Sequence, residues 1–366
     1  MRGRASFAVT PAGALWHQAG VKLPVLVLAL LSAATLSAQT LDADPPLAAD
    51  QAAFATWVGN FRTAAINKGM PAAAVDATLA GVRFSPRVVE LDRAQPDDSA
   101  WKPSVFATYL ERRLEPVRIG RGRAVAAELR PALDRIAAQS GVPVAIILGV
   151  WGMESSYGTV TGSFDVPQAL ASLAYDGRRR DLFTRELEAT VTIVARGLAD
   201  RSQLRGSWAG AMGQPQFLPS SFLAHATDGD GDGRADIWNS RADVAASIAT
   251  YLQHAGWRRG ESWGMRVTVP DTLDRDKLRN LFAPKSCVRP MEKHSRWLSV
   301  GEWRALGLTQ PSGLSWPADE TQATLVEPDG PGTPAFLTFH NYRALLDYNC
   351  SNFYALSVAL LGDALR

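Results

Sequence analysis

The chain has 366 residues, 46% of them hydrophobic and 20% charged, which is enough for two or three domains with a sizeable core. Its 38 Lys and Arg nearly balance its 36 Asp and Glu, and the sequence has no basic tract of the kind that would indicate a nucleic-acid-binding protein. Its 11 Trp residues are compatible either with a sugar-binding cleft or with ordinary core packing.

The N-terminus has the pattern of a secretory signal peptide. A basic segment, with Arg2, Arg4 and Lys22, precedes an apolar stretch over 23–36, and small residues follow it. We expect residues 1–38 to be removed on export, which would take the net charge from +2 to −1. No Cys lies near this site, so a lipid anchor is not expected. An uncleaved membrane anchor is the alternative.

Helical periodicity dominates the segment that follows. Residues 39–50, rich in Asp, Ala and Pro, are expected to form a flexible lead-in, and 51–130 a helical domain. Apolar residues at helical spacing predict a helix that ends before Gly69, a shorter one between Pro71 and Gly81, and further helices over 104–139. A polar connector that contains proline, over 92–103, interrupts this pattern.

The most unusual stretch is the uncharged run from Val144 to Met153. A run that is apolar all round belongs in a protein core, and this one is too short to cross a membrane. Glu154 stands at its end, followed by small and polar residues and Gly158. Burial makes a carboxyl resist ionisation, so Glu154 could hold a proton near neutral pH and deliver it to a leaving oxygen. The alternative is that Glu154 marks the helix end and faces water.

Further helices are predicted downstream, and the sequence pattern changes after Trp263. Helical patterns cover 166–174, 181–199, 219–226 and 243–255, and the Gly-rich segment 206–217 has weak helical character. Short strands are predicted at 266–269, 323–326 and 335–339, among Pro and Gly residues. The predicted fold class is α+β, mainly α, with a small β-containing lobe over 263–340 and C-terminal helices over 341–366.

A loop rich in Asp and Gly follows the pattern of a calcium-binding loop. Asp228, Asp230 and Asp232 stand at its first, third and fifth positions, and Arg234 would offer its backbone carbonyl. Its twelfth position lacks the expected Glu, so Asp243 from the following helix is the expected substitute. The loop predicts a weak, structural Ca²⁺ site. The alternative is an Asp/Gly turn without metal.

A segment of small residues and a pair of cysteines complete the unusual features. The segment from Gly210 to Phe222 allows close backbone approach and contains Gln216, which could bind a polar ligand. A tight turn between helices is the alternative. Cys287 and Cys350 could form one disulfide in an exported protein or remain buried thiols.

Taken together, these features resemble the lytic murein transglycosylase B family. The resemblance rests on Trp-Gly-Met-Glu-Ser-Ser-Tyr-Gly around Glu154, Gly-Ala-Met-Gly-Gln-Pro-Gln-Phe from Gly210, the Asp/Gly loop that ends in Ile-Trp, and Asp-Tyr-Asn-Cys-Ser from Asp347. It covers residues 50–365. It implies a lysozyme-like catalytic core, taken as 131–262 and including the calcium-type loop, with a flanking helical domain and a small β domain.

The resemblance also implies an activity and a set of site residues. The family cleaves the β-1,4 bond between N-acetylmuramic acid and N-acetylglucosamine in peptidoglycan and leaves 1,6-anhydromuramoyl ends without adding water. Glu154 matches the family's single catalytic acid and base. The matching substrate-binding positions are Gln216, Tyr251, Tyr348, Asn349, Tyr109, Arg179 and Arg180. The positions that match the metal loop are Asp228, Asp230, Asp232, Arg234 and Asp243.

These features predict an exported, periplasmic enzyme that acts as a monomer on the glycan strands of peptidoglycan. It is expected to use no organic cofactor and to bind no nucleic acid, with other cell-wall enzymes as further partners. Two alternatives stay open: a hydrolytic muramidase that admits water, and a non-catalytic peptidoglycan-binding protein with a degenerate site. The intact surroundings of Glu154 argue against the second.

Overall fold

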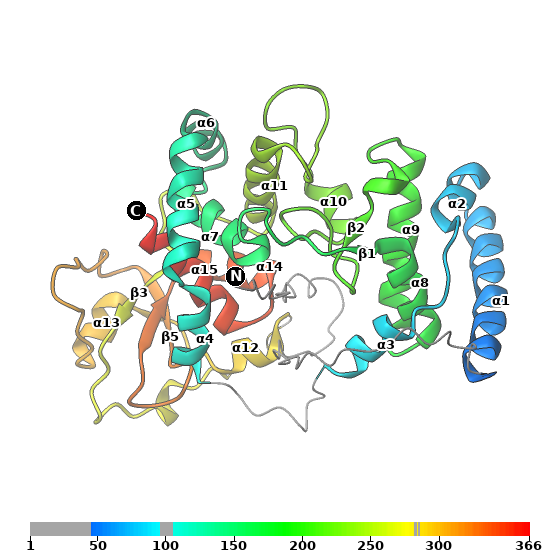
Figure 1. Ribbon diagram of the computed structural model, residues 1–366. Coiled ribbons are helices and arrows are strands. Elements are labelled where there is room, and N and C mark those ends of the chain that lie inside the picture. The colour runs from blue at the N-terminus through cyan, green and yellow to red at the C-terminus, as the bar shows by residue number, and fades with distance from the viewer. Residues whose placement is uncertain (1–44, 96–104, 282–283, 285) are drawn as a thin grey trace, which may run out of the picture.

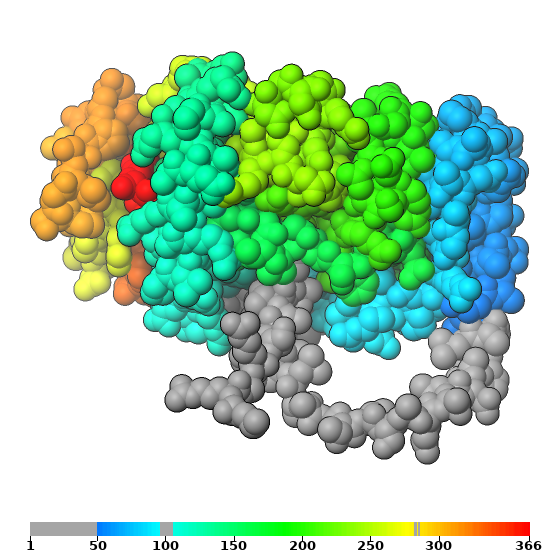
Figure 2. Space-filling model, turned by 45° about the horizontal axis from the view of Figure 1, so that its top comes forward, coloured from blue at the N-terminus to red at the C-terminus, as the bar shows by residue number. Residues whose placement is uncertain are grey.

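The computed structural model describes residues 45–95, 105–281, 284 and 286–366. The predicted signal peptide and most of the predicted connector at 92–103 lie outside these residues. Figure 1 shows a mainly helical molecule with a small sheet at one end. Figure 2 shows the N-terminal helices (blue) on one side and part of the sheet region (orange) on the other. The fold class is α+β, mainly α, as predicted.

The helices are α1 (Pro45–Asn67), α2 (Ala72–Leu79), α3 (Pro86–Arg93), α4 (Phe106–Arg113), α5 (Pro116–Glu128), α6 (Arg130–Ser140), α7 (Val144–Ser155), α8 (Val166–Asp176), α9 (Arg180–Ala195), α10 (Pro219–His225), α11 (Arg241–His254), α12 (Val288–Glu292), α13 (Val300–Ala305), α14 (Asn341–Tyr348) and α15 (Asn352–Ala364). The strands are β1 (Phe164–Asp165), β2 (Arg205–Gly206), β3 (Gly264–Val267), β4 (Leu298–Ser299), β5 (Gln322–Val326) and β6 (Ala335–Thr338).

Helix α7 lies within the main hydrophobic core, and all of its residues from Ile146 to Ser155 are buried. Helix α15 packs closely along it, because glycines leave room at the contact. No single helix of the described ranges is long and apolar enough to cross a membrane, although α6 and α7, which meet at 110°, pass that test as a bent pair.

The closeness of α7 and α15 predicts a steric effect at Gly149. A Cβ atom there would lie 2.5 Å from the carbonyl oxygen of Val358. We expect Gly149→Ala to lower the free energy of unfolding by about 1–3 kcal/mol, measured by urea denaturation, because the helices must separate. Gly120→Ala is the matched control, since nothing lies within 4 Å of a Cβ on that α5 glycine. A Gly149→Ala protein as stable as the Gly120→Ala protein would contradict the prediction.

The small sheet has the order β3-β6-β5-β4, with antiparallel neighbours. It has its own hydrophobic cluster, which includes the fully buried Trp303. His294 links it to α15, since one ring nitrogen lies 2.8 Å from Thr324 Oγ1 and the other 3.0 Å from Asn352 Oδ1. Burial lowers the pKa of His294 to about 3, so this link is uncharged at neutral pH.

Several elements differ from the predictions. Residues 206–217 are not helical: Met212 forms antiparallel bridges with Gly206 and Phe217, and the positive φ of Gln216 is incompatible with a right-handed helix. The predicted C-terminal helices are present as α14 and α15, which are separated by extended backbone at Asn349 and Ser351. Helix α1 starts inside the predicted lead-in, and α3, α12, α13 and the two-residue strands β1, β2 and β4 were not predicted.

Candidate active site

Glu154 lies in the last turn of α7 with only 2% of its surface exposed. The helix ends just after it, because Ser156 and Tyr157 have left-handed backbone, with φ of 49° and 61°. The hydroxyl of Tyr354 on α15 donates a hydrogen bond of 2.5 Å to Glu154 Oε1. The other oxygen, Oε2, is buried and has no hydrogen-bond partner among the described residues. One carboxyl oxygen is thus held by α15, and the other has an unused capacity for hydrogen bonding within the described chain.

The surroundings keep the Glu154 carboxyl protonated at neutral pH. Burial raises its pKa from an ordinary value of 4.5 to about 8, against the smaller lowering effects of the Tyr354 hydrogen bond and the charge of Arg113. This agrees with the prediction that apolar surroundings would make this carboxyl resist ionisation. No second carboxylate is among the groups that shift this pKa. The site therefore offers one proton donor with a pKa near neutrality.

Three predicted tyrosines are buried close to Glu154. Burial raises the pKa of Tyr109, Tyr251 and Tyr348, and the charge of Glu154 raises each further. The rings of Tyr251 and Tyr348 pack with centroids 4.6 Å apart. The Tyr251 hydroxyl donates to the Asp347 carbonyl over 3.1 Å, and the Tyr348 hydroxyl to the Pro215 carbonyl over 2.7 Å. These hydroxyls thus fix the chain segments around Glu154.

Gln216 and Asn349 are also buried, but only the side chain of Gln216 has hydrogen-bond partners within the described chain. Gln216 Nε2 donates to the carbonyls of Thr161 and Gly213, over 3.0 and 2.8 Å, which holds its strained backbone in place. The side-chain amide of Asn349, which lies between α14 and α15, has no hydrogen-bond partner within the described chain. Leaving a buried polar group unbonded costs about 1–3 kcal/mol, so Asn349 is a candidate for bonding a substrate.

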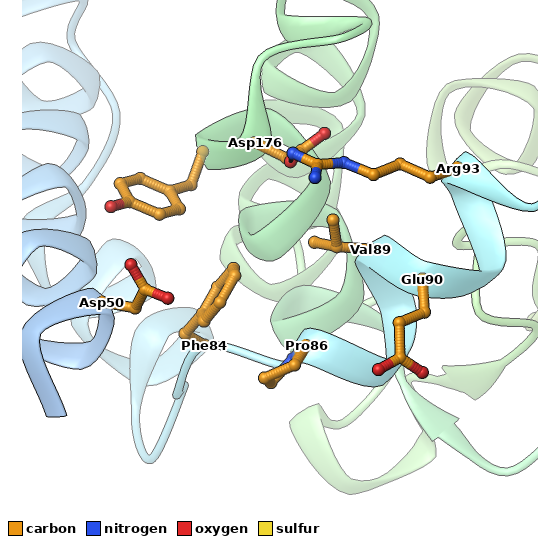
Figure 3. Close-up of a pocket in the computed structure, with 8 residues that line it drawn as sticks. Asp50, Phe84, Pro86, Val89, Glu90, Arg93 and Asp176 are labelled. Atoms are coloured by element: carbon orange, nitrogen blue, oxygen red, sulfur yellow. Dashed lines mark hydrogen bonds and ion pairs between the residues drawn. The ribbon is translucent and has the colours of Figure 1, made fainter. Parts of the chain in front are cut away.

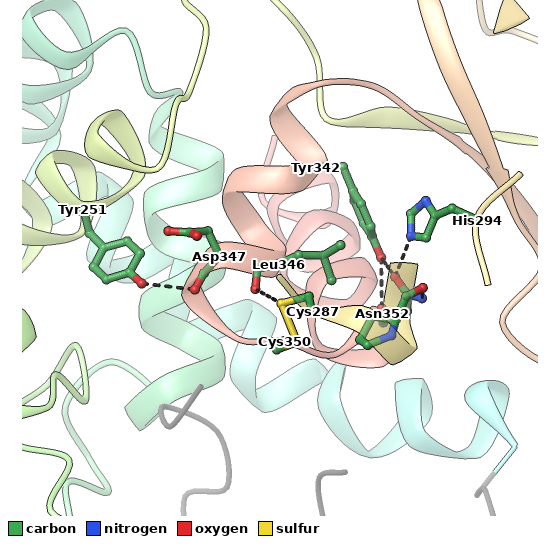
Figure 4. Close-up of a disulfide and its surroundings, with 9 residues drawn as sticks. Tyr251, Cys287, His294, Tyr342, Leu346, Asp347, Cys350 and Asn352 are labelled. Atoms are coloured by element: carbon green, nitrogen blue, oxygen red, sulfur yellow. Dashed lines mark hydrogen bonds between the residues drawn. A yellow bond between two sulfur atoms is a disulfide. The ribbon is translucent and has the colours of Figure 1, made fainter. Parts of the chain in front are cut away.

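A disulfide fixes the chain between α14 and α15. It joins Cys350, next to Asn349, to Cys287 across a sequence separation of 63 residues. Figure 4 shows it between the Tyr251–Asp347 hydrogen bond and the His294–Asn352 link. Of the two alternatives left open by the sequence, the structure therefore has the disulfide.

The predicted Arg179 and Arg180 contact α3 and the end of α8. Arg179 is buried and forms an ion pair with the buried Asp92 of α3, and its guanidinium lies 4.7 Å from the centroid of the Phe183 ring. Arg180 donates to the carbonyls of Ala174 and Tyr175 at the end of α8. Both contacts hold helices together.

The three aspartates of the calcium-type loop form a cluster. One oxygen from each of Asp228, Asp230 and Asp232 lies within 4.8 Å of the others, and all three residues are exposed. Backbone N–H groups of the loop, including that of Arg234, donate to these carboxylates. Three hard oxygen donors of this kind suit a cation such as Ca²⁺.

Burial raises the pKa of Asp243, the further ligand that was predicted, and the charge of the nearby Asp230 raises it further. Asp243 is fully buried, and its two oxygens accept hydrogen bonds from the backbone N–H groups of Gly229 and Asp236, over 2.8 and 2.7 Å. It does not belong to the three-carboxylate cluster. Asp243 therefore shapes the loop from the first turn of α11.

Tyr354 and Gln214 are site residues that sequence reasoning missed. Gln214 Oε1 accepts a hydrogen bond of 3.0 Å from the indole of Trp151 on α7, and its Nε2 donates to the Trp238 carbonyl over 2.8 Å. Gln214 therefore links α7 to the end of the calcium-type loop. Its place in the Gly210–Phe217 segment was a signal for it. No signal marked Tyr354, which lies 200 residues from Glu154 in sequence.

A pocket of about 530 Å³ lies elsewhere, among α1, α3 and α8. Figure 3 shows its lining, with Phe84, Pro86 and Val89 as apolar walls and the Arg93–Asp176 ion pair at one side. None of the predicted site residues lines it.

The chain is similar to known proteins over most of its length. The chain matches the family model described as Transglycosylase SLT domain over residues 53–363. It is 31% identical over 280 residues to the membrane-bound lytic murein transglycosylase B of Escherichia coli, covering 75% of this chain and 72% of that protein. It is similar to a structure of SltB3 from Pseudomonas aeruginosa in complex with NAG-anhNAM-pentapeptide, with a TM-score of 0.77, 38% identity, and 85% and 79% of the two chains covered. It is also similar to the Escherichia coli lytic transglycosylase SLT35 in complex with calcium, with a TM-score of 0.67, 28% identity, and 84% and 92% covered.

Proposed function

Because the chain belongs to the transglycosylase SLT domain family and is a lytic murein transglycosylase that acts on peptidoglycan, we propose that Glu154 is its single catalytic acid and base. The bond cleaved is the β-1,4 bond between N-acetylmuramic acid and N-acetylglucosamine. The observation that carries the proposal is the buried Glu154 carboxyl, with a pKa of about 8 and no second carboxylate acting on it. One group that holds and releases a proton near neutral pH can serve both halves of a reaction without water.

In the first half, Glu154 protonates the glycosidic oxygen as the bond from the muramoyl C1 to that oxygen breaks. The bonding electron pair leaves with the oxygen, which becomes the 4-hydroxyl of the departing N-acetylglucosamine. Most glycosidases place a second carboxylate beneath C1. Here the substrate's own 2-acetamido oxygen takes that role and stabilises the positive charge.

In the second half, Glu154 is an anion and removes the proton from the muramoyl C6 hydroxyl. The freed oxygen attacks C1, displaces the acetamido oxygen and closes the 1,6-anhydro ring. Glu154 is protonated again, and no water is consumed. The anhydro sugar in the ligand of the SltB3 structure supports this product for a related enzyme.

We place substrate binding on the residues gathered around Glu154. Tyr251 and Tyr348 would stack on sugar rings and not bond them through their hydroxyls, because the hydroxyls donate to backbone carbonyls. Asn349 would bond a substrate amide, which supplies the partner that its buried side chain lacks. Tyr109 and Gln216 would form further parts of the cleft wall.

The test of catalysis is digestion of isolated peptidoglycan sacculi. The purified protein is expected to release soluble muropeptides, and the Glu154→Gln variant is expected to release almost none. Binding of sacculi without release of fragments by the parent protein would favour the non-catalytic alternative. Equal release by both proteins would remove Glu154 from its proposed role.

A second part of the proposal concerns calcium. Asp228, Asp230 and Asp232 would hold Ca²⁺, which relieves the repulsion among three neighbouring carboxylates. The loop lies between Gln214, whose amide binds the Trp238 carbonyl, and α11, which carries Tyr251. Calcium would therefore act structurally, by fixing this wall of the cleft. The SLT35 structure in complex with calcium supports the assignment.

Thermal melts with calcium and with chelator test this site. At about 10 mM Ca²⁺ and a dissociation constant of roughly 10⁻⁴–10⁻³ M, the ion stabilises the fold by about 1–3 kcal/mol, or a few degrees in Tm. Asp230→Ala should abolish the shift. Asp134→Ala, which removes an exposed carboxylate on α6, should retain it. Identical melts of the parent protein in calcium and in chelator would reduce the loop to an ordinary turn.

Peptidoglycan lies outside the cytoplasm, so the enzyme acts there. We propose that residues 1–38 direct export to the periplasm and are then removed, on the basis of their basic and apolar pattern. Mass spectrometry of the protein purified from periplasmic extracts should find an N-terminus near residue 39. An intact N-terminus on membrane-bound protein would favour the uncleaved anchor.

A further inference from the structure

Arginines of α4 and α5 lie beside the end of α7 that carries Glu154. Arg113 is the last residue of α4, and Arg118 and Arg121 lie in the first two turns of α5. Helix α4 packs on α15 and α5 packs on α7. Figure 2 shows the residues of this arginine-bearing segment next to those that follow α7.

Two of these arginines are occupied by the backbone that follows Glu154. Arg118 Nε donates to Ser156 Oγ over 3.3 Å, and its Nη1 donates to the Arg113 carbonyl. Arg121 Nη1 donates to the Ser156 carbonyl over 3.3 Å and to Thr159 Oγ1 over 3.0 Å. These bonds fix the turn after α7.

Arg113 is different, because it interacts with an aromatic side chain and with no carboxylate at close range. Its guanidinium lies 5.1 Å from the centroid of the Tyr109 ring, and none of the ion pairs formed by the described residues involves it. Its charge reaches Glu154, since it is among the groups that lower the Glu154 pKa. Arg113 is partly exposed, so a ligand can reach it.

The charged groups around Arg113 have a net positive charge. Burial and the charge of Arg113 lower the pKa of Arg118, and Glu115 is the carboxylate that acts in the other direction. Glu154 carries no charge at neutral pH, because its pKa is about 8. Three guanidinium groups beside one exposed carboxylate attract an anion, and a guanidinium binds a carboxylate through two parallel hydrogen bonds.

We propose that Arg113 binds a carboxylate of the muramoyl unit of the substrate, beside the bond that is cleaved. The inference rests on the proposed function. The sugar rings of the strand are uncharged, and its carboxylates belong to the lactyl group of muramic acid or to the stem peptide attached there. Arg113 therefore distinguishes muramoyl-containing strands from polymers of N-acetylglucosamine alone.

The bound carboxylate also acts on Glu154. The positive charge of Arg113 favours the ionised form of Glu154, and a neighbouring anion offsets that charge. A substrate with a carboxylate at Arg113 therefore helps Glu154 to keep the proton that it must donate. A neutral substrate lacks this effect.

The test compares Arg113→Gln with the parent enzyme on three soluble glycans: strands that bear stem peptides, strands stripped of peptide with free lactyl carboxylates, and the stripped strands with these carboxylates methylated. We expect KM to rise about 10-fold or more for a substrate whose carboxylate Arg113 binds, and to change little for the methylated strands. A rise in KM on both charged strands would mean that Arg113 binds the lactyl carboxylate or the stem-peptide carboxylate that replaces it. A rise in KM on the peptide-bearing strands alone would mean that Arg113 binds a carboxylate of the stem peptide. A rise in KM on the stripped strands alone would mean that it binds the free lactyl carboxylate.

Arg112→Gln is the matched control, because Arg112 lies on the same turn of α4 and its side chain is exposed. It should leave KM unchanged. An equal effect of Arg113→Gln on charged and methylated strands, or no effect on any, would overturn the inference. A parent enzyme that cleaves none of the strands would instead contradict the proposed function.

Discussion

The Glu154→Gln variant is expected to cleave peptidoglycan about 10²–10⁴-fold more slowly than the parent enzyme, which is the usual contribution of a general acid and base. The amide keeps the size of the carboxyl and can still accept the hydrogen bond of Tyr354, but it can neither donate nor remove the proton that the reaction moves. Initial rates of muropeptide release measure the effect. In the parent enzyme, the rate should also fall as pH rises through about 8, because Glu154 then ionises before the substrate binds.

The same variant should be more stable than the parent at alkaline pH, which separates lost chemistry from lost folding. The folded-state pKa of Glu154, about 8, lies above its ordinary value of 4.5. The folded state therefore binds this proton more tightly than the unfolded state does. The stability that results is fully present below about pH 4.5 and is lost as pH rises to about 8. The variant has no such loss, so its advantage in Tm over the parent should grow across this range. A variant that melts well below the parent at pH 8 would contradict this account of the site.

The second large effect is expected at Tyr354. Replacing it with Phe removes the hydrogen bond that orients Glu154 and favours its ionised form. We expect kcat to fall about 10-fold, the scale of one lost hydrogen bond, and the alkaline limb of the pH profile to move to higher pH. The measurement is kcat as a function of pH on soluble glycan strands.

Tyr342→Phe is the matched control for Tyr354. Tyr342 is another fully buried tyrosine of the α14–α15 pair, but its hydroxyl donates to Asn352 and not to Glu154. Its loss should lower stability without moving the alkaline limb. If Tyr354→Phe changes stability alone, with an unaltered pH profile, Tyr354 does not position the catalytic carboxyl.

The sequence predicted the centre of this molecule well, because the signals there are local. An uncharged run of ten residues followed by Glu154 indicates a buried helix and, at its end, a carboxyl that resists ionisation. The strands near 264–267, 322–326 and 335–338 were found for the same reason, since alternation and turn residues act over a few positions.

What the sequence did not predict depends on contacts between distant residues. Tyr354 meets Glu154 only because α15 packs along α7, and helical spacing cannot show which helices will meet. Arg179 was found as a candidate by its position, but its ion pair with the buried Asp92 of α3 could not be predicted. Asp243 was found as a candidate metal ligand, but the hydrogen bonds that it accepts from Gly229 and Asp236 could not be predicted.

The most direct test of the central claim is the fate of oxygen from water. Sacculi are digested by the parent enzyme in water labelled with heavy oxygen, and the released muropeptides are analysed by mass spectrometry. If Glu154 alone moves the proton and the C6 hydroxyl attacks C1, new ends are 1,6-anhydro sugars, lighter by one water than reducing ends and free of the label. New reducing ends that carry heavy oxygen would show that water attacks C1 and that the enzyme is a hydrolytic muramidase.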